Sequence, residues 1–286
     1  GAPLGEDTFM FYRSIGINLK QLYAQTECSA YATLHRNGDA RQDTVGPPCR
    51  ECDVQIAEGG EILVKSPGNF AGYFKNPEAT REAMTDDGWL RTGDAGIMTD
   101  DGHLKVIDRA KDVGALNDGT LFAPQYIENK LKFFPYIREA VAHGNSRDHV
   151  TAFINIDLEA VGNYAERIGL SYSGYTDLSQ RPEVHDLITK NIAEVNQDLS
   201  RDSSLSSSQI RRFLILHKEL DADDGELTRT RKIRRATIAD RYGSLIEALY
   251  SSKKEVAVEA SVMLEDGRSS TFNADLRIHD VAITKT

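Results

Sequence analysis

The chain has 286 residues, of which 40% are hydrophobic and 27% charged, a composition typical of an ordinary globular protein of about two domains. Its 34 basic and 44 acidic side chains give a formal charge of −10, which argues against binding duplex nucleic acid through a basic face. No run approaches the roughly 20 apolar residues of a membrane span, no signal-like segment opens the sequence as given, and three cysteines are too few for a disulfide framework. We therefore expect a cytoplasmic protein with small-molecule substrates and no nucleic-acid partner, and we leave peripheral membrane association open.

The first 107 residues have the pattern of a β-rich domain. Residues 1–20 predict a short helix that leads into a buried strand. Alternating apolar residues predict strands over 54–56 and 61–65. Asn76, as a cap before Pro77, predicts one short helix near residues 76–84.

The stretch from residue 88 to 112 predicts a hairpin with charged groups where its strands end. Asp100-Asp101-Gly102 supplies the turn, and an apolar return strand follows it. A carboxylate at a strand end can hold a ribose diol, and a nearby arginine can bind the same sugar or a phosphate. The alternative is that these residues only form the turn of the hairpin and a solvent-exposed stretch of charged side chains.

From residue 108 onward the pattern changes to alternating strands and helices, so we place a domain boundary at residues 108–112. The apolar spacing predicts helices over 124–134, 182–199 and 238–249, strands over 140–143, 151–156 and 213–216, a serine-rich loop over 203–208, and a hairpin over 256–281.

The segment from Leu22 to Glu27 places an aromatic ring, a hydroxyl and a carboxylate within six residues. Tyr23 could stack on a base, Thr26 could donate to a phosphate oxygen, and Glu27 could hold Mg²⁺ through one oxygen. An ordinary exit from a strand into a loop is the alternative.

Six motifs occur in the order seen in adenylate-forming enzymes: residues 1–4 (Gly-Ala-Pro-Leu), 23–27 (Tyr-Ala-Gln-Thr-Glu), 60–62 (Gly-Glu-Ile) with 72–73 (Gly-Tyr), 89–94 (Trp-Leu-Arg-Thr-Gly-Asp), 108–112 (Asp-Arg-Ala-Lys-Asp) and 228–232 (Thr-Arg-Thr-Arg-Lys). The chain most closely resembles long-chain fatty-acid–CoA ligases of this AMP-binding superfamily. Residues 72–80 and 122–132 contribute most to that likeness.

The resemblance implies an α+β fold in two parts. Residues 1–107 would be the β-rich, distorted barrel-like end of the large AMP-binding domain, and residues 108–112 a hinge. Residues 113–286 would be the small α+β C-terminal domain, with helices packed on a sheet and a terminal hairpin.

The resemblance also implies a nucleotide site in the first part. Ala2 and Pro3 would line the adenine, with Tyr23 against the ring. Thr26 would donate to the α-phosphate, and Glu27 would hold the Mg²⁺ that neutralises the departing pyrophosphate.

Four further residues take roles from the same resemblance. Asp94 would clamp both ribose hydroxyls, with Arg109 as a second contact. Lys111 matches the hinge position between the domains. Lys232 matches the catalytic lysine that bridges the attacking carboxylate and the α-phosphate, although the surrounding arginines leave a solvated basic cluster as the alternative.

The implied activity is ATP-dependent ligation of a long-chain fatty acid to CoA through an acyl-adenylate, with ATP/AMP, Mg²⁺ and coenzyme A. The chain lacks the phosphate loop and the upstream acyl tunnel, and matches roughly the last two-fifths of such an enzyme. We therefore expect the piece to be inactive alone and its partner to be the N-terminal portion of the same enzyme. Two alternatives stay open: adenylation of an aromatic or short-chain carboxylate, and a catalytically dead module that binds AMP or a partner protein.

Two other candidate sites are weaker. Cys49 and Cys52 have the spacing of a redox pair or half a zinc site, but a second pair is missing. Residues 221–225 resemble the start of a calcium loop, but Lys232 stands at position twelve, where a bidentate glutamate is required. A turn before the lysine is the better interpretation.

Overall fold

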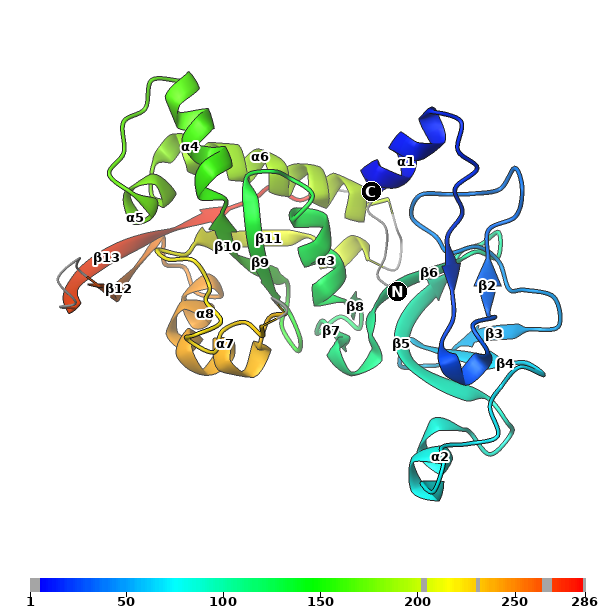
Figure 1. Ribbon diagram of the computed structural model, residues 1–286. Helices are drawn as coiled ribbons and strands as arrows, with labels where there is room; N and C mark the ends of the chain where they lie inside the picture. Colours follow the sequence, from blue (N-terminus) through cyan, green and yellow to red (C-terminus); the bar gives the residue numbers. More distant parts are fainter. Residues whose placement is uncertain (1–5, 202–204, 230–231, 264–268, 285–286) are drawn as a thin grey trace. The chain divides into compact units, whose positions relative to one another are not determined.

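The computed structural model describes residues 6–201, 205–229, 232–263 and 269–284. Contacts divide the chain into two compact units, Gly1–Val113 and Gly114–Thr286, which are described separately (Figure 1).

The first unit is built on a four-stranded antiparallel sheet in the order β3 (Asp53–Ile56), β4 (Glu61–Lys65), β5 (Leu90–Met98), β6 (Leu104–Arg109). The strands predicted from alternation and the predicted hairpin are therefore confirmed. Gly102 reverses the chain between β5 and β6 with φ +82°, a conformation that glycine adopts without strain.

The core of the first unit ties the Tyr23–Glu27 segment to this sheet. The short strand β1 (Leu22–Tyr23) pairs with β2 (Thr33–Leu34), and a 3-10 turn, η1 (Thr26–Cys28), lies between them. The buried Cys28 packs with Ile62, Val64, Leu90 and Leu104 of the sheet. Burial of Cys28 therefore anchors this turn to the sheet.

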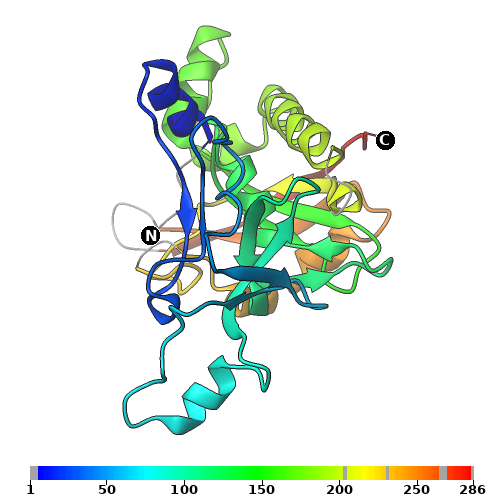
Figure 2. The same ribbon diagram turned by 90° about the vertical axis from the view of Figure 1, so that its right-hand side faces the viewer.

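The described residues of the first unit also include two helices, and one prediction here is wrong. At the start of α2 (Pro77–Ala83) the side chain of Asn76 accepts from the Ala79 N–H at 3.1 Å, so Asn76 is the helix cap that the sequence predicts. The helix buries none of its residues and projects from the sheet (Figure 2). After α1 (Glu6–Ser14), no buried strand forms over 15–20. Ile15 and Ile17 are 59% and 46% exposed, so the apolar residues there are not core positions.

The second unit is built on a five-stranded sheet in the order β12 (Glu255–Met263), β13 (Ser269–Asp280), β11 (Ile210–Ile215), β10 (Val150–Ile156), β9 (Ile137–His143). Strands β10 and β11 are parallel, and the other neighbours are antiparallel. The pairing of β12 with β13 forms the two arms that the tail alternation predicts.

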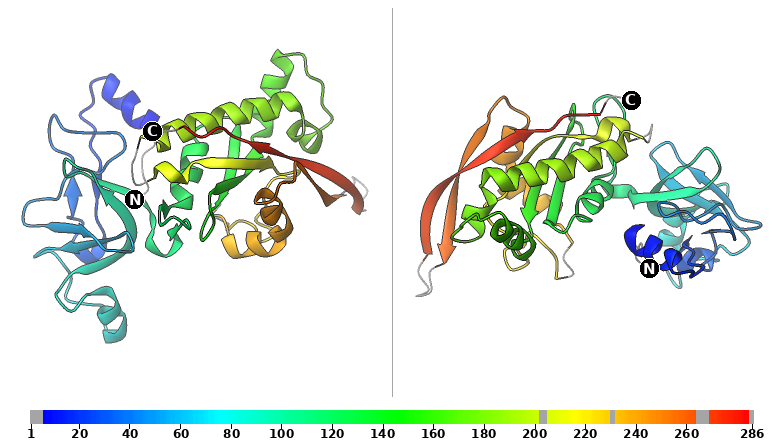
Figure 3. Two further views of the ribbon diagram at one scale, coloured as in Figure 1. Left: turned by 180° about the vertical axis from the view of Figure 1, so that it is seen from behind. Right: turned by 90° about the horizontal axis from the view of Figure 1, so that it is seen from above.

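Helices cover both faces of this sheet. The long helix α6 (Pro182–Leu199) runs along one face, and α7 (Arg235–Arg241) and α8 (Gly243–Leu249) lie against the other (Figures 1 and 3). Neighbouring residues of β11 show this alternation: Phe213 lies beside His185 of α6, whereas Leu214 packs with Leu245 of α8.

The rest of the second unit comprises α3 (Pro124–Leu131), α4 (Leu158–Arg167), α5 (Tyr175–Ser179), the short pair β7 (Gly114–Ala115) and β8 (Leu121–Phe122), and η3 (Ser206–Ser208). The single helix predicted over 238–249 is wrong. It is two helices, because Tyr242 leaves helical geometry (φ −110°, ψ 20°) and directs its hydroxyl to Glu226, and Gly243 follows. The predicted α+β fold with helices packed on a sheet is confirmed.

Candidate functional site

Asp94 is the centre of the candidate site in the first unit. It lies inside β5, not at a strand end as the sequence suggested, because the strand continues to Met98. Gly93 has φ +68°, and the pairing register shifts just after Asp94, so the strand is irregular at this point. In the ladder Asp94 is opposite Arg109, the last residue of β6.

Three side chains from two segments converge on the Asp94 carboxylate. The Tyr23 hydroxyl donates to Oδ2 at 2.7 Å, and Gln25 Nε2 donates to the same oxygen at 2.9 Å. Arg109 Nη1 pairs with Oδ1 at 2.8 Å. The structure therefore brings together Tyr23, Asp94 and Arg109, three of the residues that the sequence assigned to nucleotide binding.

Thr92 fastens this cluster to the sheet. Its hydroxyl donates to the carbonyl oxygen of Ile62 at 2.7 Å, and its own carbonyl oxygen accepts from Gln25 Nε2 at 2.7 Å. The Asp94 N–H lies 3.2 Å from the Thr92 hydroxyl. These bonds fix the distance between the η1 turn and β5.

The side chains of this cluster differ in their exposure to solvent. The Asp94 side chain is 14% exposed, whereas that of Arg109 is 58% exposed. Burial raises the pKa of Tyr23 well above its ordinary value, and the hydrogen bond and charge of Asp94 add to the increase. Tyr23 therefore stays a protonated donor at neutral pH.

The side chain of Glu27, in the middle of η1, is held by Tyr73. The Tyr73 hydroxyl donates to Glu27 Oε1 at 2.7 Å, and this bond raises the pKa of Tyr73. The Glu27 carbonyl oxygen accepts from the Phe70 N–H at 2.7 Å, and the Phe70 and Tyr73 rings meet edge-on at 4.8 Å. No group of three or more acidic, histidine or cysteine ligands occurs among the residues that the structure describes.

Two further residues of the first unit that were assigned roles from the sequence are exposed. Thr26 begins η1 and is exposed, and Lys111 is exposed within η2 (Ala110–Asp112). Ala2 and Pro3 lie outside the described residues.

Lys232 belongs to the second unit and is exposed. Its backbone is anchored by Thr228: the Lys232 N–H lies 2.9 Å from the Thr228 hydroxyl, and the Thr228 N–H donates to the Lys232 carbonyl oxygen at 2.8 Å. Nearby, Arg235 is bound to the buried Glu128, with both Nη–Oε distances 2.7 Å.

Sequence reasoning missed two polar residues of the first-unit site. Gln25 lies between residues that were assigned roles and holds Asp94 as Tyr23 does. Tyr73 was noted only as part of a motif, and its bond to Glu27 spans 46 positions of sequence. A pattern along the chain gives no signal for such a contact.

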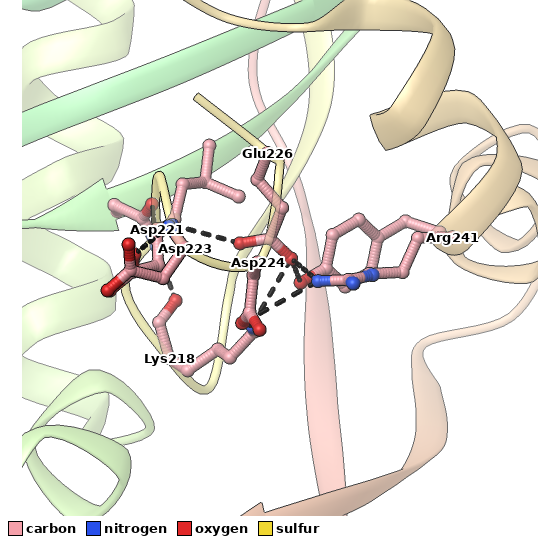
Figure 4. A network of polar contacts seen from close by, with 9 residues as sticks. Lys218, Asp221, Asp223, Asp224, Glu226 and Arg241 are labelled. Carbon is pink, nitrogen blue, oxygen red and sulfur yellow. Dashed lines mark hydrogen bonds and ion pairs between the residues drawn. The ribbon is translucent and has the colours of Figure 1, made fainter. Parts of the chain in front are cut away.

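The weaker candidates are accounted for by local bonding. Cys49 and Cys52 are free thiols, and burial raises the pKa of each, which disfavours the reactive thiolate. In the loop near residue 224, Lys218 pairs with Asp224 and Arg241 pairs with Glu226 (Figure 4).

In the part of the chain that the structure describes, no helix has the length and apolar character needed to cross a membrane.

The fold of the chain is that of adenylate-forming domains. The adenylation domain of a carboxylic acid reductase from Segniliparus rugosus, solved with AMP and a co-purified carboxylic acid, matches 87% of the chain with a TM-score of 0.59 and 23% identity, over 38% of its own length. MatB from Rhodopseudomonas palustris matches 86% of the chain with a TM-score of 0.54 and 19% identity, over 45% of its length.

The chain belongs to the family of AMP-binding enzymes. The model of the AMP-binding enzyme family matches residues 1–74, and the model of the AMP-binding enzyme C-terminal domain matches residues 111–254. The resemblance inferred from the six motifs is thereby confirmed.

Among the similar curated proteins are two ligases of Mycobacterium tuberculosis. One, a long-chain fatty-acid–CoA ligase, is 34% identical over 254 residues, and the other, a putative fatty-acid–CoA ligase, is 37% identical over 253 residues. The human long-chain fatty-acid–CoA ligase 1 is 33% identical over 267 residues. Each match covers 88% of this chain but only 41%, 43% and 38% of the relative, so the chain spans about two fifths of their length.

Proposed function

We propose that this chain is the C-terminal part of an AMP-forming ligase that joins a long-chain fatty acid to CoA through an acyl-adenylate. The observation that supports this most directly is the Asp94 cluster, where Tyr23, Gln25 and Arg109 orient one carboxylate. Relatives that match 88% of the chain are named fatty-acid–CoA ligases, which supports the choice of acid and acceptor.

Asp94 is the proposed acceptor for the ribose hydroxyls of ATP. A carboxylate offers about four lone-pair positions, and Tyr23, Gln25 and Arg109 use three of those on Asp94. Arg109 is the most exposed of the three, with a side chain that is 58% exposed. Its movement toward a phosphate would free Oδ1, so that both hydroxyls of the ribose could donate to Asp94.

The proposed surroundings of the base and phosphates are the other residues assigned from the sequence. Ala2 and Pro3 would line the adenine, with the Tyr23 ring beside it. Thr26, exposed at the start of η1, would donate to an α-phosphate oxygen.

Glu27 fits the requirements of a Mg²⁺ ligand. Mg²⁺ is usually bound by one or two carboxylates together with substrate phosphates and water. Glu27 accepts from Tyr73 through Oε1 and is partly exposed, and a carboxylate has further lone pairs that an ion can use. When bound, the ion would neutralise charge on the phosphates as pyrophosphate departs.

The proposed reaction has two steps. In the first, a carboxylate oxygen of the fatty acid attacks the α-phosphorus of ATP, the bond to the β-phosphate breaks, and pyrophosphate leaves. In the second, the CoA sulfur attacks the acyl carbonyl carbon, the bond to the phosphate oxygen breaks, and AMP leaves while the thiol proton passes to solvent. The Lys232 ammonium would bridge the carboxylate and the α-phosphate in the first step only.

A change of domain orientation would separate these steps. We propose that residues 108–112 form the hinge between residues 1–107 and the small domain over 113–286, with Lys111 at its centre. A hinge needs a few residues that can absorb a backbone rotation, and Lys111 lies exposed in a single 3-10 turn. We also propose a cytoplasmic location, because three cysteines are too few for a disulfide framework.

The test uses the complete enzyme with ATP, CoA and either palmitate or benzoate. We expect palmitoyl-CoA as the product, and a preference for benzoate would contradict the choice of acid.

Lys232→Ala should abolish most ATP–pyrophosphate exchange but leave thioester formation from supplied acyl-AMP largely intact. AMP binding without either half-reaction would identify a binding module instead of an enzyme.

A further inference from the structure

Residues 226–228 and 232–234 are the two arms of a short hairpin that carries Lys232, and backbone hydrogen bonds join these arms. Leu227 pairs with Ile233 in an antiparallel bridge. One step toward the tip, Thr228 donates its N–H to the Lys232 carbonyl oxygen at 2.8 Å, and the Lys232 N–H lies 2.9 Å from the Thr228 hydroxyl. The backbone of an exposed lysine is therefore held by one residue through two bonds.

A buried carboxylate fixes the start of this hairpin. Glu226 is completely buried and accepts from Tyr242 at 2.6 Å, from Arg241 at 2.7 Å and from Lys218 at 3.2 Å (Figure 4). Its carbonyl oxygen accepts from the Arg234 N–H at 2.9 Å, which closes the base of the ladder. The start of the hairpin is thus bound to α7 and to the segment after β11.

A second buried carboxylate fixes the chain just beyond the hairpin. Glu128 of α3 is 2% exposed and receives both Nη groups of Arg235 at 2.7 Å, in the two-pronged geometry that gives charged pairs their directional specificity. Its Oε1 also accepts from the Ala142 N–H of β9 at 2.9 Å. Because Arg235 begins α7, this pair ties the end of the hairpin to a helix and a strand of the core.

We propose that Thr228 and the Glu128–Arg235 pair are positioning residues for Lys232, which hold residues 226–228 and 232–235 in place before any substrate binds. This inference rests on the proposed role of Lys232 in adenylate formation. An ammonium that bridges two reacting groups acts through its placement, and a displacement of about 1 Å can cost on the order of 100-fold in rate. Lysine has a long flexible side chain, so a fixed backbone is the contribution that the chain can make in advance.

The principal variant is Thr228→Val, which keeps the volume and removes the hydroxyl that accepts from Lys232. In the complete enzyme we expect ATP–pyrophosphate exchange to fall by about 10- to 100-fold, while thioester formation from supplied acyl-AMP stays within about twofold. Thr228→Ser should restore exchange. In the present 286-residue chain, amide hydrogen exchange at Lys232 should accelerate in Thr228→Val and return toward the native rate in Thr228→Ser.

Glu128→Gln tests the second anchor, with Asp280→Asn as a control carboxylate in the same unit. Asp280 lies on β13, is 55% exposed and binds Arg212, whose side chain is 10% exposed. Both variants should lower the unfolding midpoint, but only Glu128→Gln should depress adenylate formation selectively. If Glu128→Gln does not fold, Thr228→Val decides the question.

Equal loss of both half-reactions in Thr228→Val, or unchanged exchange at the Lys232 amide, would overturn the inference. Lys232→Ala separates this from failure of the proposed function. If Lys232→Ala is selective and Thr228→Val is not, only the positioning role falls. If Lys232→Ala leaves adenylate formation intact, both proposals fall.

Discussion

The Tyr23 hydroxyl donates to Oδ2 of Asp94 across 2.7 Å, although 71 positions of sequence separate the two residues. Gln25 shares the same oxygen, and Arg109 takes the other. The turn after β1 and the irregular centre of β5 therefore meet at one carboxylate. A preoriented carboxylate loses little freedom when a ligand donates to it, which favours binding of a diol.

Tyr23→Phe should weaken nucleotide binding without abolishing it. The change keeps the ring and removes one hydrogen bond to a charged group, an interaction that contributes about 1.5–3 kcal/mol. We expect the KM for ATP in the complete enzyme to rise by about tenfold, the effect of roughly 1.4 kcal/mol, and kcat to change less. Tyr31→Phe is the control, because Tyr31 is 46% exposed in the same segment. An equal effect in both variants would contradict a specific role for the Tyr23 hydroxyl.

Much of the fold could be predicted wherever burial follows a regular period. The stripe of Val184, Ile188, Ile192 and Leu199 gave both ends of α6, because one face of that helix is completely buried. The helix α4 was not predicted from the sequence, although Asp157 caps it by accepting from the Ala160 N–H at 2.9 Å.

The candidate site was less predictable, because its geometry depends on pairing between strands. The sequence placed Asp94 at a strand end, whereas the strand continues past it and its carboxylate accepts from Tyr23 of another strand. The roles of Gln25 and Tyr73 could not be predicted, since each acts on a residue distant in sequence. Propensity and spacing contain no information on such contacts.

Gly46→Ala should prevent the first unit from folding normally. Gly46 has φ +88°, and a Cβ there would lie 2.3 Å from the Leu34 carbonyl carbon and 2.4 Å from the His35 nitrogen, both of them backbone atoms that cannot move aside. We expect the free energy of unfolding to fall by more than about 3 kcal/mol, which exceeds the usual 1–2 kcal/mol for an alanine in the left-handed region. Urea unfolding followed by the fluorescence of Trp89, the single tryptophan of the chain, reports on this unit.

Gly38→Ala is the matched control for that prediction. Gly38 has φ +79° but would place its Cβ with nothing within 4 Å, so only the backbone strain applies. Its loss should stay near 1–2 kcal/mol. Similar losses at the two positions would show that the Gly46 contact is relieved by movement of the loop.

Glu27→Gln should raise the Mg²⁺ concentration that the complete enzyme needs for half-maximal ATP–pyrophosphate exchange. The amide keeps the acceptor for Tyr73 but removes the negative charge that favours a divalent cation. We expect an increase of about tenfold, with most activity recovered at high Mg²⁺. Glu61→Gln serves as the control, because that carboxylate is already bound to Arg91 and to the Gly93 N–H.

The second unit should lose stability on acidification because of His185. This side chain is completely buried on α6, and its ring stacks on His279 of β13 at 4.2 Å. Burial, with the nearby His279 and Arg277, lowers the pKa of His185 from 6.5 to about 3. The unfolded chain therefore binds this proton more readily than the folded chain between pH 6.5 and pH 3, so stability is complete above 6.5 and declines as the pH falls through that window.

At pH 5 the buried His185 should lower the unfolding free energy of the second unit by about 2 kcal/mol, since each pH unit below 6.5 corresponds to about 1.36 kcal/mol. His185→Phe keeps an aromatic ring beside Phe213 and should reduce the difference in unfolding free energy between pH 7.5 and pH 5, measured by urea unfolding and far-ultraviolet circular dichroism. Some pH dependence of the unfolding free energy should remain in this variant, because burial also lowers the pKa of His143 to about 3.

Asn191→Leu, at a buried and non-ionisable position of the same helix, is the control and should shift stability equally at both pH values. The Trp89 signal of the first unit should be indifferent to His185→Phe, and an unchanged pH dependence of the second unit would exclude His185 as the source of its acid sensitivity.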